Sequence, residues 1–591
     1  MMRAALAGSI VVLAYVGIAR TARAQEPVQD TREVPDTREV TVYEAAKIIT
    51  MEPSLPTARF VAVSGGIILG TAETLTELAP WTDGRKVTND RRFAKNILMP
   101  GLIDPHVHPM QSAVMMNIPF IAPDEWTLPG GYYPAARTAG DYRRLLRAQL
   151  ANANPGPNAP PFVSWGHHEL FHGPIDRAEL DDIGGARPVI IWQRSFHDVI
   201  MNSAALRHFG IDSRDAFDAL LAEAKADPAH GNYDKGIFSE TALVAALGKL
   251  RPLLLSPEKL QSGFAATKKM MLRSGVTTVS DMGTGIFAPF DVEAALIQKS
   301  FERPENPSRV MLMPMANQAA SGVNLDEWLT GITKRYAGRN VRVDRRIKVF
   351  ADGAFFAQNM RMNAPGYSDG HIGKWITPPD IAAAQYQQFW DAGFDLHIHV
   401  NGDEGLDAVL NGLQKLDRTR GQTITLEHLG YSTEAQNRQI AKMGLMVSAQ
   451  PNYIRVLGDV YGKHGLGADR AAVINRLGSL EKKNVALGLH SDFNMAPIDP
   501  LYLAWIAANR ITVGGNVKAP GERLSLDKAL RAITIEAAQV IGMDDMTGSI
   551  AAGKKADFAV MDRDPYSGGA AKLRDVKILA VVFEGRAFPV E

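Results

Sequence analysis

The sequence contains no cysteine among its 591 residues. Without thiols the chain can form neither a disulfide nor a cysteine nucleophile, and it cannot bind a metal through thiolates. Any metal site must therefore use nitrogen and oxygen ligands. Net charge is absent as well, since 64 Lys and Arg residues balance 64 Asp and Glu residues. Such a chain has no global field that would attract nucleic acid or an anionic membrane, so we expect a small-molecule partner and no nucleic acid.

Long apolar runs are also missing, except near the start of the sequence. Arg3 precedes an apolar run over residues 4–18, and Ala22-Arg23-Ala24 offers a small-residue cleavage site. This pattern predicts a signal peptide over residues 1–24 and a periplasmic or secreted chain that begins near Gln25. The alternative is an uncleaved membrane anchor, but the run is shorter than the roughly 20 residues that span a bilayer. After cleavage we expect no stable membrane span, and a disordered lead-in over residues 25–40.

Short apolar runs separated by turns occur at both ends of the remaining chain. Residues 58–63 and 67–70 flank a glycine-containing turn, which predicts a hairpin. Residues 555–562 and 576–583 are again strand-like. We therefore expect residues 41–99 and 544–591 to form one small β-sandwich domain from both chain ends.

Helix-like and strand-like segments alternate between these ends. Apolar, β-branched runs at residues 275–280, 346–350 and 394–400 follow helix-like stretches, which predicts parallel strands with helical crossovers. The fold class is therefore α/β, with a closed (β/α)8 TIM-type barrel over residues 100–543. An open doubly wound sheet is the alternative, although no Gly-rich phosphate loop supports its dinucleotide-binding form. A stretch at about 110–270 exceeds one strand-helix unit and predicts a long insertion. It either shapes the substrate pocket or is a surface insertion with its own minor core.

Candidate metal ligands occur where predicted strands end, which is where the catalytic groups of such barrels gather. His106 and His108 are spaced i, i+2, so a strand would direct both imidazoles to one side. Lys348 lies inside an apolar strand, where an ordinary lysine would bury its charge at a cost of several kcal/mol. Three further candidates end later strands: His399 with His397 before it, His428, and Asp492 with His490 before it. Taken singly, each has an ordinary alternative as a hydrogen-bonded structural residue or a cap.

The order His-x-His, Lys, His, His, Asp resembles the metal-dependent amidohydrolase superfamily. The stretches at residues 43–70, 98–104 and 548–558 are similar to the leading and closing segments of its small sheet domain. Lys348-Val-Phe-Ala-Asp352-Gly353 and His399-Val-Asn-Gly402-Asp403 resemble amidohydrolase family 3, the branch that includes the N-substituted formamide deformylases. The next residues, 354–359, depart from that branch in a loop expected near the substrate, so a relative's substrate is not carried over.

The resemblance implies a ligand set and a base. His106 and His108 would hold one divalent ion, and His399 and His428 a second. Lys348 would bridge the two ions if carbon dioxide converted its amine to an N6-carboxylated form. Asp492 would bind a metal-held water and take its proton as general base. The expected cofactor is one or two zinc ions.

The implied activity is that of an exported metal-dependent hydrolase acting on carbon-nitrogen bonds other than peptide bonds. We expect an N-acyl or N-formyl amide as substrate. The same site could instead cleave an ester, a lactone or a phosphoester, and an inactive exported binding protein that retained the fold is the alternative outside enzymes. Candidate substrate-binding residues are His197, Asn202, Tyr367 and His397.

Overall fold

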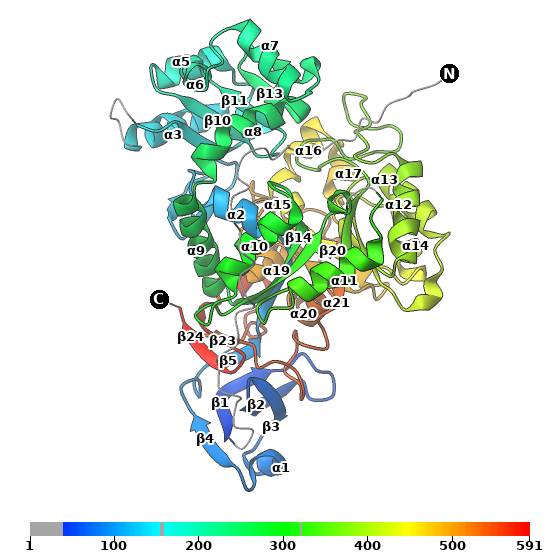
Figure 1. Cartoon of the computed structure of the whole chain (residues 1–591). Coiled ribbons are helices and arrows are strands. Elements are labelled where there is room, and N and C mark those ends of the chain that lie inside the picture. The colour runs from blue at the N-terminus through cyan, green and yellow to red at the C-terminus, as the bar shows by residue number, and fades with distance from the viewer. Residues whose placement is uncertain (1–38, 154–158, 320–321, 591) are drawn as a thin grey trace.

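A computed structural model describes residues 39–153, 159–319 and 322–590 (Figure 1). The predicted signal peptide and most of the predicted lead-in lie outside these residues. The first two residues of strand β1 (Glu39–Ile49) fall within the range 25–40 that the sequence predicts as lead-in. Val40 and Val42 are buried on one face of the sheet, and this burial is why the strand starts before residue 41.

Strands from both chain ends meet in one small sheet. β5 (Ile97–Pro100) pairs in parallel with β1 and antiparallel with β22 (Phe558–Met561), which joins the two ends of the chain. The sheet has eight strands, and the remaining members are β2 (Thr57–Ser64), β3 (Ile67–Ala72), β4 (Lys86–Asp90), β23 (Ile578–Phe583) and β24 (Arg586–Pro589).

The two faces of this sheet carry separate apolar clusters. Tyr43 and Val61 lie in one cluster, whereas Val42 and Phe60 lie in the other. Successive side chains of a strand point to opposite faces, so the alternation fills both. The sandwich predicted for these segments is therefore built as a single hydrogen-bonded sheet with a core on each side.

The middle of the chain forms the eight parallel strands of the barrel. They are β6 (Leu102–Val107), β14 (Val276–Thr284), β15 (Arg309–Pro314), β17 (Arg346–Phe350), β18 (Asp395–Val400), β19 (Ile424–His428), β20 (Met446–Ala449) and β21 (Leu487–Leu489). Each pairs in parallel with the next within two runs, from β6 to β15 and from β17 to β21.

Contacts at two seams close the ring of strands. A parallel bridge between Met315 and Lys348 joins the β15 side to β17. At the other seam, the Asp492 amide donates to the His106 carbonyl at 2.9 Å, and the Ser491 amide donates to Asp104 Oδ1 at 3.1 Å. The predicted (β/α)8 barrel is confirmed, and the open doubly wound sheet is excluded.

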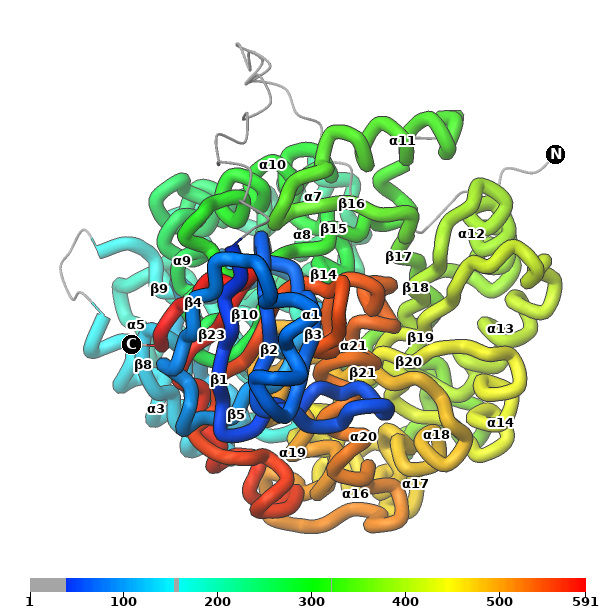
Figure 2. The backbone as a smooth tube through the Cα atoms, turned by 90° about the horizontal axis from the view of Figure 1, so that it is seen from below, coloured from blue at the N-terminus to red at the C-terminus, as the bar shows by residue number. Residues whose placement is uncertain are grey.

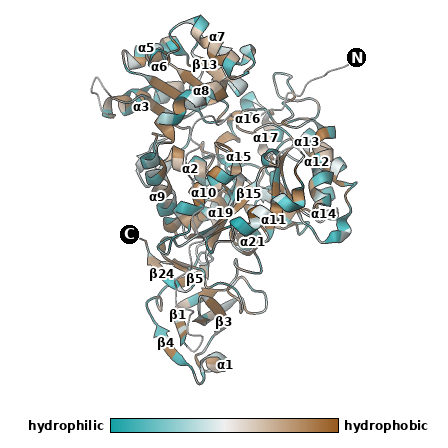
Figure 3. Ribbon diagram, in the orientation of Figure 1, coloured by the Kyte–Doolittle hydropathy of each residue, from teal (hydrophilic) through white to brown (hydrophobic). Residues whose placement is uncertain are grey.

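Amphipathic helices cover the outside of the barrel. Helix α9 (Pro257–Arg273) buries residues at helical spacing, namely Leu260, Gly263, Phe264, Thr267, Met270 and Met271. Figure 2 shows α12 (Pro379–Asp391), α13 (Asp403–Leu413) and α14 (Glu434–Lys442) outside β17 to β20, and Figure 3 shows hydrophilic residues on such outer helices. Among the helices of the described ranges, none is both long enough and apolar enough to cross a membrane.

The insertion follows β6 and its short helix α2 (Pro109–Met115). Its own sheet runs in the order β12 (Gly231–Asn232), β13 (Ile237–Ser239), β11 (Asp198–Met201), β10 (Val189–Gln193) and β9 (Phe162–His167). It ends with α8 (Glu240–Leu254). The predicted insertion, at about 110–270, includes most of α9, which packs against α2 and strand β14. Figure 1 shows the insertion and the small sheet at opposite ends of the barrel.

Candidate metal centre

Four of the predicted histidines and Asp492 come together where the barrel strands end. Ring centroids lie 5.3 Å apart for His106 and His108, 4.7 Å for His106 and His428, and 4.5 Å for His399 and His428. Asp492 joins this cluster, since its Oδ1 lies 3.2 Å from His108 Nε2. Residues separated by hundreds of positions in the sequence therefore share one site.

Strand register explains why Lys348 and His397 face the interior beneath this cluster. Lys348 of β17 pairs with His397 of β18, and His399 pairs with Glu427 of β19. Paired residues of neighbouring parallel strands point to the same face of the sheet, and positions two apart repeat that direction. Lys348 is only 1% exposed, and its Nζ makes no hydrogen bond to a described residue.

Two members of the cluster depend on unusual backbone conformations. Glu427 faces the interior, so simple alternation would direct the next residue, His428, to the other face. His428 instead has a φ of 75°, and Asp492 has a φ of 48°. Non-glycine residues rarely adopt this left-handed region, and such strain gathers at functional sites. The strained turn brings the His428 ring to the mouth of the barrel.

Glu427 is a site residue that sequence reasoning missed. Its carboxylate is fully buried, with Oε2 at 2.8 Å from His106 Nδ1 and Oε1 at 2.7 Å from His397 Nδ1. The sequence does carry a clue, because Glu427 is a charged residue in the apolar run 424–428, as Lys348 is in its own strand. A charged residue inside an apolar strand is therefore the signal that points to Glu427.

Burial holds most of the histidines neutral. It lowers the pKa of His399 to about 3 and that of His490 to about 4, and it takes the pKa of His106 and of His428 well below the usual range. A neutral imidazole keeps a nitrogen lone pair free for a metal. His108 differs, because the carboxylates of Asp281 and Asp492 outweigh burial and raise its pKa to about 9.

Lys348 and Asp492 also have shifted pKa values at this site. Burial lowers the pKa of Lys348 to about 8, against the opposing influence of Glu427 and Asp492. Burial would raise the pKa of Asp492, but the neighbouring His108, His490 and Lys348 outweigh it and lower that pKa. Asp492 is therefore an ionised carboxylate at neutral pH.

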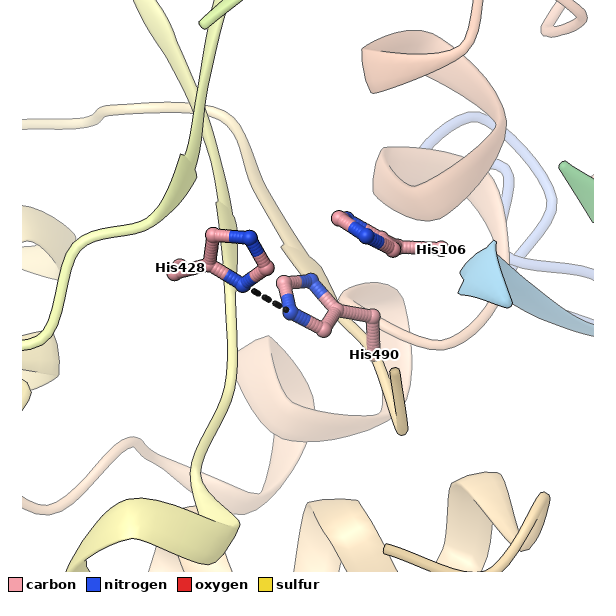
Figure 4. A group of neighbouring side chains, drawn as sticks. All are labelled: His106, His428 and His490. Atoms are coloured by element: carbon pink, nitrogen blue, oxygen red, sulfur yellow. Dashed lines mark hydrogen bonds between the residues drawn. The ribbon is translucent and has the colours of Figure 1, made fainter. Parts of the chain in front are cut away.

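The donor set fits a divalent metal. Two overlapping triads, His106 with His428 and His490, and His106 with His108 and Asp492, each have ligand atoms within 4.8 Å of one another. Imidazole nitrogen and carboxylate oxygen are the usual ligands of zinc and similar ions outside thiolate sites. Figure 4 shows the first triad, in which His428 Nδ1 lies 3.2 Å from His490 Nε2. Ser448 Oγ lies 2.7 Å from the other nitrogen of His490.

The four predicted substrate-binding residues have different surroundings. His397 contacts Glu427 in the barrel interior. Asn202 caps helix α6 (Ser203–His208), and its amide group bonds the backbone of residues 187, 189 and 205, so both ends of the amide are occupied. His197 Nδ1 lies 3.1 Å from Glu240 Oε2 within the insertion. Tyr367 is buried and stacks on His371 at 4.2 Å.

The insertion reaches the loop that carries Asp492 through a buried arginine. Arg194, from the turn after β10, is 0% exposed and donates to Asp124 Oδ1 at 2.6 Å and to the Met495 carbonyl at 3.0 Å. Its guanidinium lies 5.2 Å from the centre of the Trp165 ring and 5.0 Å from that of Phe356. Sequence reasoning placed this insertion near the site but did not single out Arg194.

The loop at 354–359 packs at the same end of the barrel. Phe355 stacks on Tyr453 at 4.1 Å with an interplanar angle of 9°, and on Tyr461 at 5.0 Å. Tyr453 belongs to the helix that follows β20. The residues that depart from the family 3 pattern thus form an aromatic stack beside the cluster.

An α/β barrel that gathers imidazoles and a carboxylate at the ends of its strands defines the class of metal-dependent hydrolases. A sequence model described as the amidohydrolase family matches residues 95–588, and the chain belongs to this family. The resemblance found in the sequence is therefore confirmed. The chain is a metal-dependent hydrolase of amidohydrolase type, an enzyme that acts on carbon-nitrogen bonds.

Known proteins resemble this chain over nearly its whole length. The N-substituted formamide deformylase of Arthrobacter pascens is 24% identical over 91% of this chain and 96% of its own. The protein LONG AFTER FAR-RED 3 of Arabidopsis thaliana is 25% identical over 88% of this chain and 86% of its own. A solved structure of an uncharacterized metal-dependent hydrolase from Pyrococcus horikoshii OT3 superposes with a TM-score of 0.66 at 20% identity, covering 90% of this chain and 99% of that chain.

Proposed function

We propose that the chain hydrolyses an N-acyl or N-formyl amide, a carbon-nitrogen bond other than a peptide bond, with Asp492 as general base. One observation carries the proposal: the Asp492 carboxylate lies among three imidazoles. Its Oδ1 is 3.2 Å from His108 Nε2 and 3.6 Å from His106 Nε2, and its Oδ2 is 3.9 Å from His428 Nδ1. The name of the Arthrobacter pascens relative, a deformylase of N-substituted formamides, supports the amide class.

The metal centre of the proposal contains one or two zinc ions. His106, His108, His399, His428 and Asp492 would hold them, together with Lys348 in N6-carboxylated form. A divalent ion there supplies a Lewis acid, and it makes hydroxide available at neutral pH by lowering the pKa of water from about 15.7 to about 7. The lowered pKa of Lys348, about 8, supports carboxylation, because part of its amine is then neutral and able to attack carbon dioxide.

Asp492 moves the proton in this proposal. Its ionised carboxylate takes a proton from the attacking water while the oxygen bonds to the acyl carbon. The protonated carboxyl then returns that proton to the amide nitrogen as the carbon-nitrogen bond breaks. The products are a carboxylic acid and an amine. His108 and the strained backbone at residue 492 hold the carboxylate in position for both transfers.

The test is Asp492→Asn, assayed on a panel of N-acyl and N-formyl compounds with zinc supplied. We expect kcat to fall at least about a hundredfold, since an amide cannot accept the proton, while the far-UV circular dichroism stays unchanged. Asp369→Asn is the matched control, because Asp369 lies in an exposed loop with a side chain 70% accessible. An unchanged kcat in Asp492→Asn would remove Asp492 as the base.

The same panel separates the alternatives. Turnover of esters, lactones or phosphoesters without turnover of any amide would contradict the amide proposal in favour of the other hydrolytic reactions. Binding of amides by the zinc-loaded wild type without turnover would indicate a binding protein that retained the fold.

We also propose that the chain is exported to the periplasm or secreted. The support is the sequence pattern of residues 1–24, with its basic start, apolar run and Ala22-Arg23-Ala24 site. Amino-terminal sequencing of protein recovered from the periplasm or medium of a bacterial host should then begin near Gln25. A chain that begins at Met1 and stays in the cytoplasm would contradict export.

A further inference from the structure

The fully buried Glu427 carboxylate contacts two imidazoles on different strands. Glu427 Oε2 lies 2.8 Å from His106 Nδ1, and Oε1 lies 2.7 Å from His397 Nδ1. His397 is on β18, the neighbour of β19, but His106 is on β6, which pairs with β14 and closes the barrel against the end of β21. The contact with His106 therefore spans the barrel interior rather than linking adjacent strands.

This contact decides which nitrogen of His106 is free. A carboxylate accepts the proton of Nδ1, so the imidazole takes the Nδ1–H form and its lone pair stays on Nε2. His106 Nε2 in turn lies 3.6 Å from Asp492 Oδ1. His108 has the same orientation, with Nδ1 at 3.6 Å from Asp281 Oδ1 and Nε2 at 3.2 Å from Asp492 Oδ1.

We propose that Glu427 is a positioning residue that fixes His106 in the Nδ1–H form and thereby makes Nε2 its metal-binding atom. The second oxygen of Glu427 contacts His397, which pairs with Lys348 beneath the cluster and belongs to neither triad, so we assign His397 as a support of the carboxylate and not as a ligand. A carboxylate behind a ligating histidine sets its tautomer and ring direction and raises its basicity. The inference rests on the proposed metal centre.

The surroundings of Glu427 make this role sensitive to substitution. Glu427 and His397 are both 0% exposed, and His106 is 1% exposed. Water from the bulk cannot easily take the place of the carboxylate at such a position. Replacing the acid by an amide leaves His106 facing a group that can donate as well as accept, so the ring is no longer held in one tautomer.

The experiment measures the zinc dissociation constant of the full chain by competition with a chelator, with the Co²⁺ absorption spectrum as a second readout. For Glu427→Gln we expect affinity to fall by about 10- to 100-fold and the Co²⁺ bands to shift. For His397→Gln we expect a change within about threefold, because Glu427 still holds His106. Glu434→Gln is the control, since that glutamate starts α14 with a side chain 46% exposed.

The outcomes separate the two proposals. A wild-type chain that binds no zinc would overturn both the metal centre and the role of Glu427. Zinc binding by the wild type, with Glu427→Gln within about threefold of it, would overturn the role of Glu427 alone. His397→Gln weakening zinc as strongly as Glu427→Gln would show that His397 is a ligand. Should Glu427→Gln fail to fold, Glu427→Asp replaces it, and its shorter reach should weaken zinc likewise.

Discussion

The Lys348 side chain lies in the barrel interior, and its Nζ makes no hydrogen bond to a described residue. Its Nζ lies 5.5 Å from the centre of the Phe350 ring, and the side chain is almost fully buried. A buried ammonium without a hydrogen-bonded partner is costly, so an ordinary lysine is a poor choice at this position. The proposed carboxylation would turn the same side chain into an anionic oxygen ligand, which would suit a site next to His399 and His428.

Replacing Lys348 by alanine should therefore cost metal. We expect the zinc content per chain of Lys348→Ala, measured by elemental analysis, to fall, and millimolar acetate or propionate to restore part of it by filling the space with a carboxylate. Lys334→Ala, on the exposed side of α11 (Leu325–Arg335), should keep the wild-type zinc content. Loss of zinc without any rescue would point to an unmodified lysine.

The sequence predicted which residues would lie together in the cluster, but not which contacts position them. Their positions at strand ends made the four histidines and Asp492 candidates, because parallel strands all end at one edge, and the family resemblance chose His399 over His397. Sequence reasoning did not single out Glu427 and Asp281, since their contacts with His106 and His108 form only in the closed barrel. The turn of His428 toward the site depends on a positive φ that alternation of side chains does not predict.

Helices α2 and α9 hold the segment that follows the His-x-His pair. Helix α2 begins at Pro109, immediately after His108, and α9 packs directly against it. Gly263 of α9 makes this approach possible, because a Cβ at that position would lie 1.8 Å from the Ala113 carbonyl oxygen. The position of His108 thus depends on a missing side chain in another helix.

Gly263→Ala should destabilise the protein by about 1 to 3 kcal/mol, since the two helices must move apart. The matched control is Gly248→Ala in α8, where a Cβ would meet nothing within 4 Å. That change should be neutral or stabilise by up to about 1 kcal/mol, because alanine favours a helix. Thermal unfolding of both variants checks the contrast, and equal melting temperatures would refute it.

Elements with a clear period were predicted well, and element boundaries less so. The run at residues 346–350 is the observed strand β17. The assignment of α9 to the barrel or to the insertion cannot be made from its sequence alone. That assignment needs the contact between Gly263 and Ala113, which lie 150 positions apart.

A buried ion pair joins the barrel to the small sheet in the molecule as a whole. Arg309 of β15 donates to Asp557, which directly precedes β22, and its second nitrogen lies 3.3 Å from Glu584 Oε1. Arg309 also lies 4.6 Å from the centre of the Phe583 ring. Both members of the pair are buried, so the two units of the chain share charges that water does not reach.

Removing Asp557 should cost stability, because the Arg309 guanidinium stays buried with Glu584 as its remaining ion-pair partner. We expect Asp557→Asn to lower the unfolding free energy by about 3 to 5 kcal/mol in a denaturant titration. The double variant Arg309→Met with Asp557→Asn should lose less, since the buried guanidinium is gone and Glu584 keeps its ion pairs with Arg339 and Lys555. Asp562→Asn, at an exposed pair with Arg563, serves as control. Equal stability of the single and double variants would refute the coupling.

The seam between β6 and the end of β21 also determines how late in synthesis the cluster can be completed. Asp104 and Ser491, which bond across it, are 387 positions apart, and Asp492 follows at once. At a synthesis rate of about 10 residues per second, the ribosome makes the last part of the site roughly 40 s after the first. Until the ring closes, His106 and His108 lack the carboxylate they share. If Asp492 is the general base, as we propose, a nascent or truncated chain that lacks it should not hydrolyse the substrate.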